Sequence, residues 1–549
     1  MEKTKKNLYQ IILLIFLYIS MIITIMIGRN NVTISKNEGG DNPSKLPSNN
    51  FSISNNNILF NRNLLGGNST EILDEGNKLN KSLNSIFYFL FIIESILFSL
   101  DLFYLILSKG NEKELNEIIS NKIYIIILSL GTLTLTIIIT IILVFITKSF
   151  ALPELEAKGI IEITTDETIE NKFYETTEPN LNIILVKNGG NATLKNLNLN
   201  KTGNSSNIEN SDFYGINSVL LVESNSKAEI INSKIISKAE GGDGIFSYGK
   251  NSEITITNSV IETYGEISSC GLHATYLGKI RGDNISITTL GKSCPSLAST
   301  FHRGEGEIIC YYCNLITKGK GSPIIYTKGN MTANYNNGYS LNSQIIVKEG
   351  NSFVHILNSN FYSSGIGNRN NVDNCGIMIY QSKSVDAIAT GDFLCENSSL
   401  NIFNDSIVYN SAPFFFITNT NAYIIVKNCS LHFGSNILIS SKGTNEWGKK
   451  NNNGGHTYFE SVEQKLFGNI ILDNISSLIF NLTKGSYFEG SINYDNKGEV
   501  DLILDINSKI KLTNNSYVNR FIFVEKKNVD LNNFSLFVNG TNWNESIIE

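Results

Sequence analysis

The sequence predicts an all-β protein whose main part is a solenoid of stacked coils, preceded by three membrane-spanning helices at the N-terminus. Two observations predict the solenoid: a short strand phrase with a central asparagine keeps returning, and an apolar anchor recurs between these phrases. Three long apolar runs before residue 150 predict the helices. A chain of 549 residues has room for both parts.

The clearest copy of the phrase is S-E-I-T-I-T-N-S-V-I-E-T-Y-G at residues 252–265. Ile254 and Ile256 alternate with polar residues and therefore share one face of a strand. Asn258 then marks a corner, because asparagine tolerates the left-handed conformation and hydrogen-bonds to nearby backbone. Stacked in register, such asparagines can also bond to one another from coil to coil. The corner asparagines predicted in this way are Asn196, Asn232, Asn258, Asn284, Asn314, Asn358 and Asn428.

The second anchor is a small residue or proline followed by a bulky apolar residue, as in Gly271-Leu272 and Pro323-Ile324. Most anchors are roughly 21–37 residues apart, a spacing in the range of solenoid repeats. Short strands between Asn, Gly and Ser corners, with no amphipathic helix between them, favour a β-solenoid.

With these phrases the chain resembles the pectin-lyase-like right-handed parallel β-helix over roughly residues 180–540. The resemblance implies the fold and its right hand, and it implies no specific activity. Residues 380–387, 416–424, 447–456 and 488–493 also resemble phrases of uncharacterised surface β-helix proteins of the adhesin-like kind. That narrower resemblance implies an outward-facing solenoid and supplies no known active site.

The apolar runs at residues 11–27, 86–107 and 123–146 are the expected membrane spans. Lys3, Lys5 and Lys6 place the N-terminus in the cytoplasm by the positive-inside rule. Three spans then put residues 151–549 outside the cell. The alternative for the first run is a cleaved signal peptide, which leaves the solenoid in the same location.

These patterns divide the chain into segments and predict an integral membrane protein with an extracellular solenoid. The segments are a transmembrane anchor at 1–28, a disordered extracellular loop at 29–82, a second transmembrane helix at 83–108, a cytoplasmic loop at 109–121, a third transmembrane helix at 122–147, a linker and cap at 148–180, the parallel β-helix at 181–540, and a C-terminal tail at 541–549.

All seven cysteines lie in the segment expected outside the cell, where disulfides are stable. Cys270 and Cys294 come just before consecutive anchors, so we expect them about 5 Å apart on adjacent coils and joined by a disulfide. Cys310 and Cys313 have the spacing of a redox motif, but no thioredoxin-like pattern surrounds them. No second ligand pair is spaced for zinc, so neither a metal nor another cofactor is expected.

The sequence offers only weak catalytic candidates. Hydrolases with a β-helix fold use clustered aspartates as acid and base, whereas Asp243 and Asp283 lie singly beside glycines, which favours corner positions. His302 lies in the most charged stretch of the array, where binding of an acidic sugar, proton transfer or a solvated corner are all open. The arginine-rich signature of pectate lyases is absent.

Charge and aromatic content limit the possible partners. A net charge of −6 without a basic patch gives no sign of nucleic-acid binding. Abundant aromatic residues along the solenoid either stack on sugar rings or pack within the coils.

We therefore expect a membrane-anchored cell-surface protein that acts in adhesion or carbohydrate binding without catalysis, with a polysaccharide or another surface protein as partner. The alternatives are a polysaccharide lyase or glycoside hydrolase, and a purely structural surface protein. Frequent N-x-Ser/Thr sequons would fit glycosylation.

Overall fold

A computed structural model of the chain describes residues 156–300, 306–369, 371–382 and 390–543. The expected segments that end before residue 148 lie outside the described residues. The candidate residue His302 lies outside them as well.

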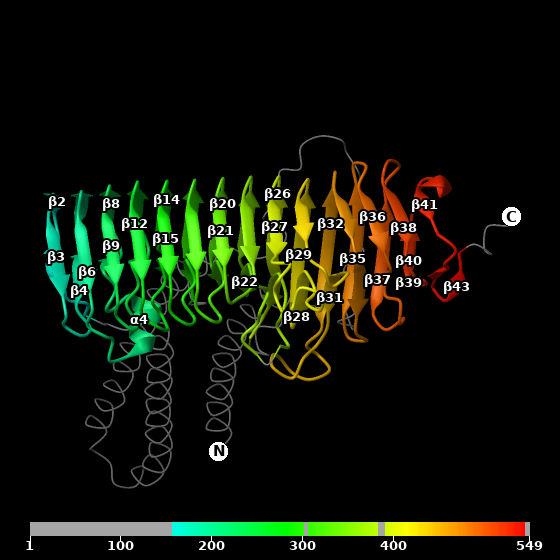
Figure 1. Cartoon of the computed structure of the whole chain (residues 1–549), viewed down its shortest axis with the longest axis horizontal. Coiled ribbons are helices and arrows are strands. Elements are labelled where there is room, and N and C mark those ends of the chain that lie inside the picture. Colours follow the sequence, from blue (N-terminus) through cyan, green and yellow to red (C-terminus); the bar gives the residue numbers. More distant parts are fainter. Residues whose placement is uncertain (1–155, 301–305, 370, 383–389, 544–549) are drawn as a thin grey trace, which may run out of the picture. The chain divides into compact units, whose positions relative to one another are not determined.

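The described chain is a parallel β-helix solenoid in which most coils contribute one strand to each of three long sheets (Figure 1). The first sheet has twelve strands, β1 (Gly159–Ile163), β4 (Asn182–Val186), β7 (Leu220–Val222), β10 (Ile245–Tyr248), β13 (Leu272–Thr275), β16 (Leu297–Ser299), β19 (Ile325–Thr327), β22 (Ile346–Glu349), β25 (Ile377–Tyr380), β28 (Phe415–Thr418), β31 (Ile437–Ser441) and β34 (Asn469–Leu472). The second has fourteen, β2 (Asp166–Glu170), β5 (Asn191–Lys195), β8 (Lys227–Ile231), β11 (Glu253–Thr257), β14 (Lys279–Asp283), β17 (Glu307–Tyr311), β20 (Asn330–Asn334), β23 (Phe353–Leu357), β26 (Thr390–Glu396), β29 (Thr420–Lys427), β32 (Gly455–Val462), β35 (Ser477–Thr483), β37 (Glu499–Leu504) and β40 (Arg520–Ile522). The third has ten, β3 (Phe173–Thr176), β6 (Asn198–Lys201), β9 (Lys234–Ser237), β12 (Val260–Thr263), β15 (Ser286–Thr289), β18 (Asn314–Thr317), β21 (Asn337–Ser340), β24 (Asn360–Ser363), β27 (Ser399–Ile402) and β30 (Ser430–His432).

The core is a stack of inward-facing apolar side chains from successive coils. In β11, Ile254 and Ile256 are buried and alternate with more exposed polar residues. Strand register places Ile254 against Ala228 in the preceding coil and Ile280 in the next. Burial of each such isoleucine stabilises the fold by about 1.5–3 kcal/mol. The period-two alternation seen in the sequence is therefore what fills the solenoid.

A column of left-handed residues forms the corner between the second and third sheets. Asn196, Asn232, Asn258, Asn284, Asn358 and Asn428 have φ between 47° and 53°. The backbone N–H of each one donates to a carbonyl of the next coil. Asn314 lies elsewhere, as the first residue of β18. In its coil the corner is taken by Tyr312, with φ of 54°.

Several corner asparagines also bond to one another through their side chains. Asn284 Nδ2 donates to Asn258 Oδ1 at 2.8 Å. The same amide contact joins Asn196 to Asn171 at 3.0 Å. It recurs between Asn428 and Asn397 at 2.8 Å. These bonds, together with the positive φ that asparagine accepts, explain why the residue recurs in the sequence at this corner.

The solenoid begins and ends with departures from the regular coil. Three strands, β1 to β3, already lie in the range expected to be linker and cap. Beyond β30 the last coils use a four-stranded sheet, composed of β33 (Lys465–Phe467), β36 (Tyr487–Gly490), β38 (Lys509–Leu512) and β41 (Val529–Asp530). A final sheet contains β39 (Ser516–Val518), β42 (Leu536–Val538) and β43 (Thr541–Asn542), near the short 3₁₀ turn η3 (Lys526–Asn528). β42 and β43 are antiparallel, which ends the parallel ladder.

The first sheet is buried on both faces over much of its length. Helix α4 (Ile208–Tyr214) lies against its outer face near the N-terminal coils, where the Tyr214 and Tyr248 rings are 5.7 Å apart. Farther along, Trp447 from a corner insertion packs edge-on against Tyr380, at a centroid distance of 5.3 Å. These covering segments bury outward-facing apolar side chains of the first sheet, among them Leu221, Phe246 and Phe416.

The predicted fold class holds for its all-β part and is corrected for its helical part. The described residues form long parallel sheets, as a parallel β-helix requires. None of their helices is long and apolar enough to cross a membrane, and α4 has seven residues. The three expected spans lie within residues 1–147, outside the described residues. Hydropathy reports how a segment partitions into an apolar phase, and it does not by itself establish a three-helix region in the fold.

Candidate functional site

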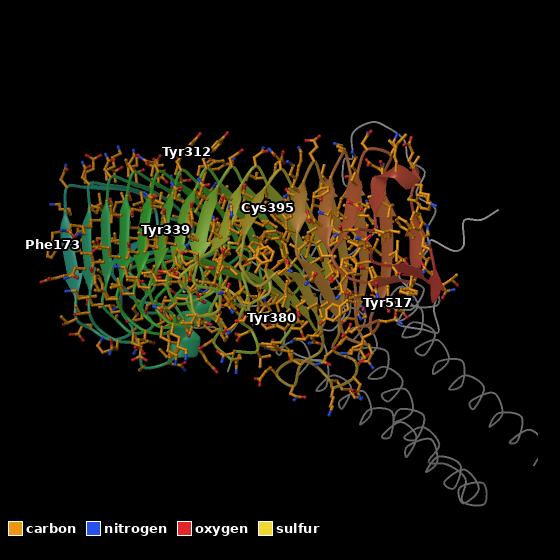
Figure 2. The ribbon with its side chains drawn as sticks, turned by 45° about the vertical axis from the view of Figure 1, so that its right-hand side comes forward. Phe173, Tyr312, Tyr339, Tyr380, Cys395 and Tyr517 are labelled. Atoms are coloured by element: carbon orange, nitrogen blue, oxygen red, sulfur yellow. The ribbon has the colours of Figure 1, made fainter. Side chains whose placement is uncertain are left out.

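An exposed pair of tyrosines interrupts the column of corner asparagines. Tyr312 and Tyr335 hold the corner in consecutive coils, with φ of 54° and 57°. Their rings stack with centroids 5.1 Å apart and an interplanar angle of 7°. The two residues are 58% and 49% exposed. Figure 2 shows Tyr312 projecting from the edge of the solenoid into solvent.

A second tyrosine pair lies near the first on the outer face of the third sheet. Tyr339 in β21 pairs in register with Tyr362 in β24, and their rings stack at 5.3 Å. Tyr339 follows Tyr335 by four residues, so both lie on the outside of one coil. An exposed, in-register row of asparagines runs between the two pairs: Asn314, Asn337 and Asn360. We call these four tyrosines and three asparagines the tyrosine–asparagine surface.

Tyrosine is a costly residue at these corners. The left-handed conformation is rare for bulky L-residues and costs roughly 1–2 kcal/mol, whereas asparagine adopts it readily. An asparagine here would also extend the amide contacts of the column, as Asn284 does with Asn258. The stacking of the two rings offsets part of this cost, by about 0.5–1.5 kcal/mol, but leaves both rings exposed to solvent. Exposed residues in a strained conformation concentrate at functional positions, which makes this pair a candidate binding site.

An open pocket of about 370 Å³ lies where the first sheet ends. Its polar lining comes from Asn436, Asn469, Ser491, Tyr494, Thr513 and Asn514. Asn469 Oδ1 already accepts hydrogen bonds from Ser491 N at 3.0 Å and Ser491 Oγ at 2.8 Å. The lining holds amides, hydroxyls and a phenol but no charged group, so it suits neutral polar ligands.

The candidate Asp243 belongs to a buried polar cluster next to α4. Its Oδ2 lies 3.0 Å from His273 Nδ1, and its Oδ1 accepts a hydrogen bond from Cys270 N at 2.6 Å. His273 Nε2 lies 3.0 Å from Thr300 Oγ1, which donates to Asp212 O at 2.9 Å. Burial opposes the charged imidazolium, yet the neighbouring Asp243 carboxylate leaves the pKa of His273 raised above its ordinary value. The cluster is closed to solvent and presents no free acid or base to a substrate.

A second buried cluster lies farther along the same face. Glu349 Oε2 accepts from the hydroxyls of Tyr326 and Tyr380, each at 2.9 Å. Its Oε1 accepts from Ser382 Oγ and pairs with Lys328 Nζ at 3.2 Å. Burial opposes the charge, but Lys328 and the three hydroxyl donors hold the pKa of Glu349 below its ordinary value. Both carboxylate oxygens are occupied, so Glu349 acts as a structural anion.

The predicted candidates do not come together. Asp283 ends β14 in the second sheet and is half-buried. Asp243 precedes β10 in the first sheet, so the two aspartates do not form an acid–base pair. In the same strand as Asp283, the guanidinium carbon of Arg281 lies 4.7 Å from the centroid of the Tyr311 ring in the next coil.

The disulfide expected between Cys270 and Cys294 is not present, and both residues are buried free thiols. Leu272 pairs with Leu297 in the first sheet. Counting back along both segments places Cys294 opposite Ser269, one residue away from Cys270. Cys270 precedes its anchor leucine by two residues and Cys294 precedes its own by three, so the two thiols are not directly opposite each other.

Asp243 and Cys270 were each candidates in the sequence analysis, but their contact was not predicted. They are 27 residues apart, and His273 is 30 residues from Asp243. Their positions could have predicted this contact, because each lies within three residues of a first-sheet anchor and the anchors belong to consecutive coils. No sequence pattern predicted that Thr300 completes the cluster.

The sequence matches no protein-family model, no curated protein and no solved structure.

Proposed function

We propose that the solenoid binds polysaccharide at the tyrosine–asparagine surface, without catalysis. The observation that carries this proposal is the stacked, exposed pair Tyr312–Tyr335 at corners that asparagine holds in most other coils. Aromatic rings offer apolar faces and edges to the C–H faces of sugars, and the phenol adds a polar tip. The flanking amides supply both donors and acceptors for sugar hydroxyls.

The surface is also uncharged, which narrows the class of ligand. Its seven residues are tyrosines and asparagines, so binding should depend little on ionic strength. A neutral polymer that spans several coils fits better than an acidic one. The repeat of the coils, about 4.8 Å, presents the same groups several times along the chain of such a polymer.

An adhesin-like role and a pectin-lyase-like relationship, which the resemblances implied, belong to this proposal, since a rigid solenoid is a suitable scaffold for binding. The extracellular location of residues 151–549 and glycosylation remain predictions. Protease added to intact cells tests the first, and a mass shift on glycosidase treatment tests the second.

The full chain is incubated with a panel of plant and microbial polysaccharides, and both protein depletion and release of sugar ends are measured in the same tubes. The test variant carries Tyr312→Asn and Tyr335→Asn, which gives both corners the residue that their neighbours use. We expect binding to weaken about 10-fold, taking as a guide the roughly 1–3 kcal/mol that an aromatic ring contributes when a nucleic-acid base stacks on it. Stability should change by no more than about 1 kcal/mol, because relief of the strain at two corners offsets the lost stacking of the two rings.

Two exposed tyrosines outside the surface serve as matched controls. Tyr264→Asn tests whether any exposed ring matters, and it should bind like the wild type. Tyr494→Asn tests the open pocket. Loss of binding in Tyr494→Asn alone would move the site to that pocket and refute the proposal for the tyrosine–asparagine surface. Release of sugar ends would show an enzyme instead, and no depletion with any polymer would also refute the proposal.

A further inference from the structure

The buried cluster around Asp243 needs a cation between two of its members. Thr300 Oγ1 donates its only hydrogen to Asp212 O at 2.9 Å, so toward His273 it can only accept. His273 Nε2, at 3.0 Å, therefore carries a hydrogen and donates it to Thr300. The other ring nitrogen, Nδ1, faces Asp243 Oδ2 at 3.0 Å. A neutral ring and a carboxylate would bring two lone pairs together there, so a proton or a metal ion must lie between them.

Cys270 supplies a third donor atom at the same place. One ligand atom from each of Asp243, Cys270 and His273 lies within 4.8 Å of the other two, and all three residues are buried. Ligand atoms bound to one tetrahedral zinc ion are roughly 3.4–3.6 Å apart, from the usual bond lengths. Side-chain shifts of about 1 Å would therefore bring all three onto one ion.

We propose that Asp243, Cys270 and His273 bind a Zn²⁺ ion. Thiolate, imidazole and carboxylate are all ligands that zinc accepts. Binding releases two protons, one from the Cys270 thiol and one from between His273 and Asp243. A neutral thiol with an imidazolium–carboxylate pair becomes a Zn²⁺ ion with two anionic ligands, so the cluster has no net charge before or after. This balance matters because an uncompensated charge in a buried site is costly.

The remaining partners match the supports of a metal site. Metal-bound histidines usually donate their second ring hydrogen to a fixed acceptor, and Thr300 Oγ1 is such an acceptor. Thr300 is held in turn by Asp212 in α4. The ion would join the coil of Asp243 to the next coil and, through Thr300, would help to hold α4 on the first sheet.

The test uses the full chain after treatment with a chelator, titrated with Zn²⁺ and separately with Co²⁺. We expect one zinc ion per chain by elemental analysis. With Co²⁺ we expect a thiolate-to-cobalt charge-transfer band in the near ultraviolet and visible bands of a low-coordinate cobalt ion. Cys270→Ser should remove the charge-transfer band.

Three further variants separate metal binding from folding, which circular dichroism monitors. Asp243→Asn should lose the ion yet stay folded, because an amide can accept from Cys270 N and donate to His273 Nδ1 without a cation. Cys375→Ser is the matched control, a buried free thiol several coils away from the cluster, and it should keep the ion. Thr300→Val should weaken zinc binding about 10- to 100-fold.

Two results would overturn the proposal. One is a folded wild-type chain that binds no zinc above the buffer blank. The other is a metal content and cobalt spectrum that stay unchanged in both Cys270→Ser and Asp243→Asn. In either case the cation between His273 and Asp243 is a proton, and the cluster is an ion pair. Neither result bears on polysaccharide binding, which involves different residues.

Discussion

Lys201 is a buried charge whose effect on stability can be worked out from the structure. It ends β6 with no exposed surface, and its Nζ donates to Leu181 O at 2.7 Å and Glu178 O at 3.2 Å. The residue stacked on it in the next coil is the uncharged Ser237. Burial lowers the pKa of Lys201 from 10.5 to about 8. Because the folded chain binds this proton more weakly than the unfolded chain, burial of Lys201 lowers the free energy of unfolding at neutral pH by about 3 kcal/mol.

The sign of the pH dependence follows from which state binds the proton more tightly. The unfolded chain does, because its lysine keeps the higher pKa, so stability should rise as the pH rises between about 8 and 10.5. From pH 7 to 9.5 the contribution of Lys201 should increase by about 2 kcal/mol. Lys201→Met removes the titrating group and keeps a side chain of similar length. The free energy of unfolding of the wild type minus that of Lys201→Met should therefore rise by about 2 kcal/mol over this range.

Urea unfolding of both proteins, followed by circular dichroism at several pH values from 7 to 9.5, measures this difference. Other titrating groups are common to both chains and cancel. The variant leaves the carbonyls of Glu178 and Leu181 without a partner, which costs about 1–3 kcal/mol each, but that cost does not depend on pH. A difference that stays constant across the pH range would mean that Lys201 keeps an ordinary pKa in the folded chain.

Three further predictions concern the corners, the second buried cluster and the thiols. Asn258→Ala should destabilise the fold by about 1–2 kcal/mol in urea unfolding, because it removes the bond to Asn284 and places alanine in the left-handed region. Asn258→Gly keeps that conformation and should cost less, so equal costs would contradict the role of φ. Glu349→Gln should cost about 2–4 kcal/mol at pH 7, because it leaves the largely buried Lys328 without its partner. Since the pKa of Glu349 is lowered below 4.5, this difference should persist above that pH and shrink as the pH falls through the lowered value, and no shrinkage would argue against an ionised Glu349. A thiol reagent added to the denatured chain without reductant should count seven thiols, whereas a count of five would show a disulfide.

Much of the fold could be predicted because its determinants are local. Alternation such as that of Ile254 and Ile256 assigns each residue to the inside or outside of a coil, and the structure keeps that assignment. A left-handed corner depends on one residue, so asparagine marks it wherever it occurs, as at Asn196 and Asn428. The prediction was wrong at Asn314 because the pattern assumed asparagine at every corner, whereas Tyr312 takes the corner position in this coil.

The sites could be predicted only in fragments because they depend on register. Asp243 and His273 are 30 residues apart, and only the pairing of successive coils brings their side chains to 3.0 Å. The expected Cys270–Cys294 bond failed for a similar reason, since the two cysteines lie at different distances from the paired leucines and are not directly opposite each other. Register is set by the packing of whole coils and by the lengths of their corners. Neither can be read from the sequence of a single strand.

Alternation and corner preference act within a few residues, so the stacked, asparagine-cornered strands beyond about residue 181 could be recognised from the amino-acid order. Which side chains meet depends on how the coils stack. It stacked Tyr312 on Tyr335 in the open, and it enclosed Asp243, Cys270 and His273 next to α4. The physical reason is that a solenoid converts positions one coil apart into direct neighbours, so its chemistry depends on the length of each turn.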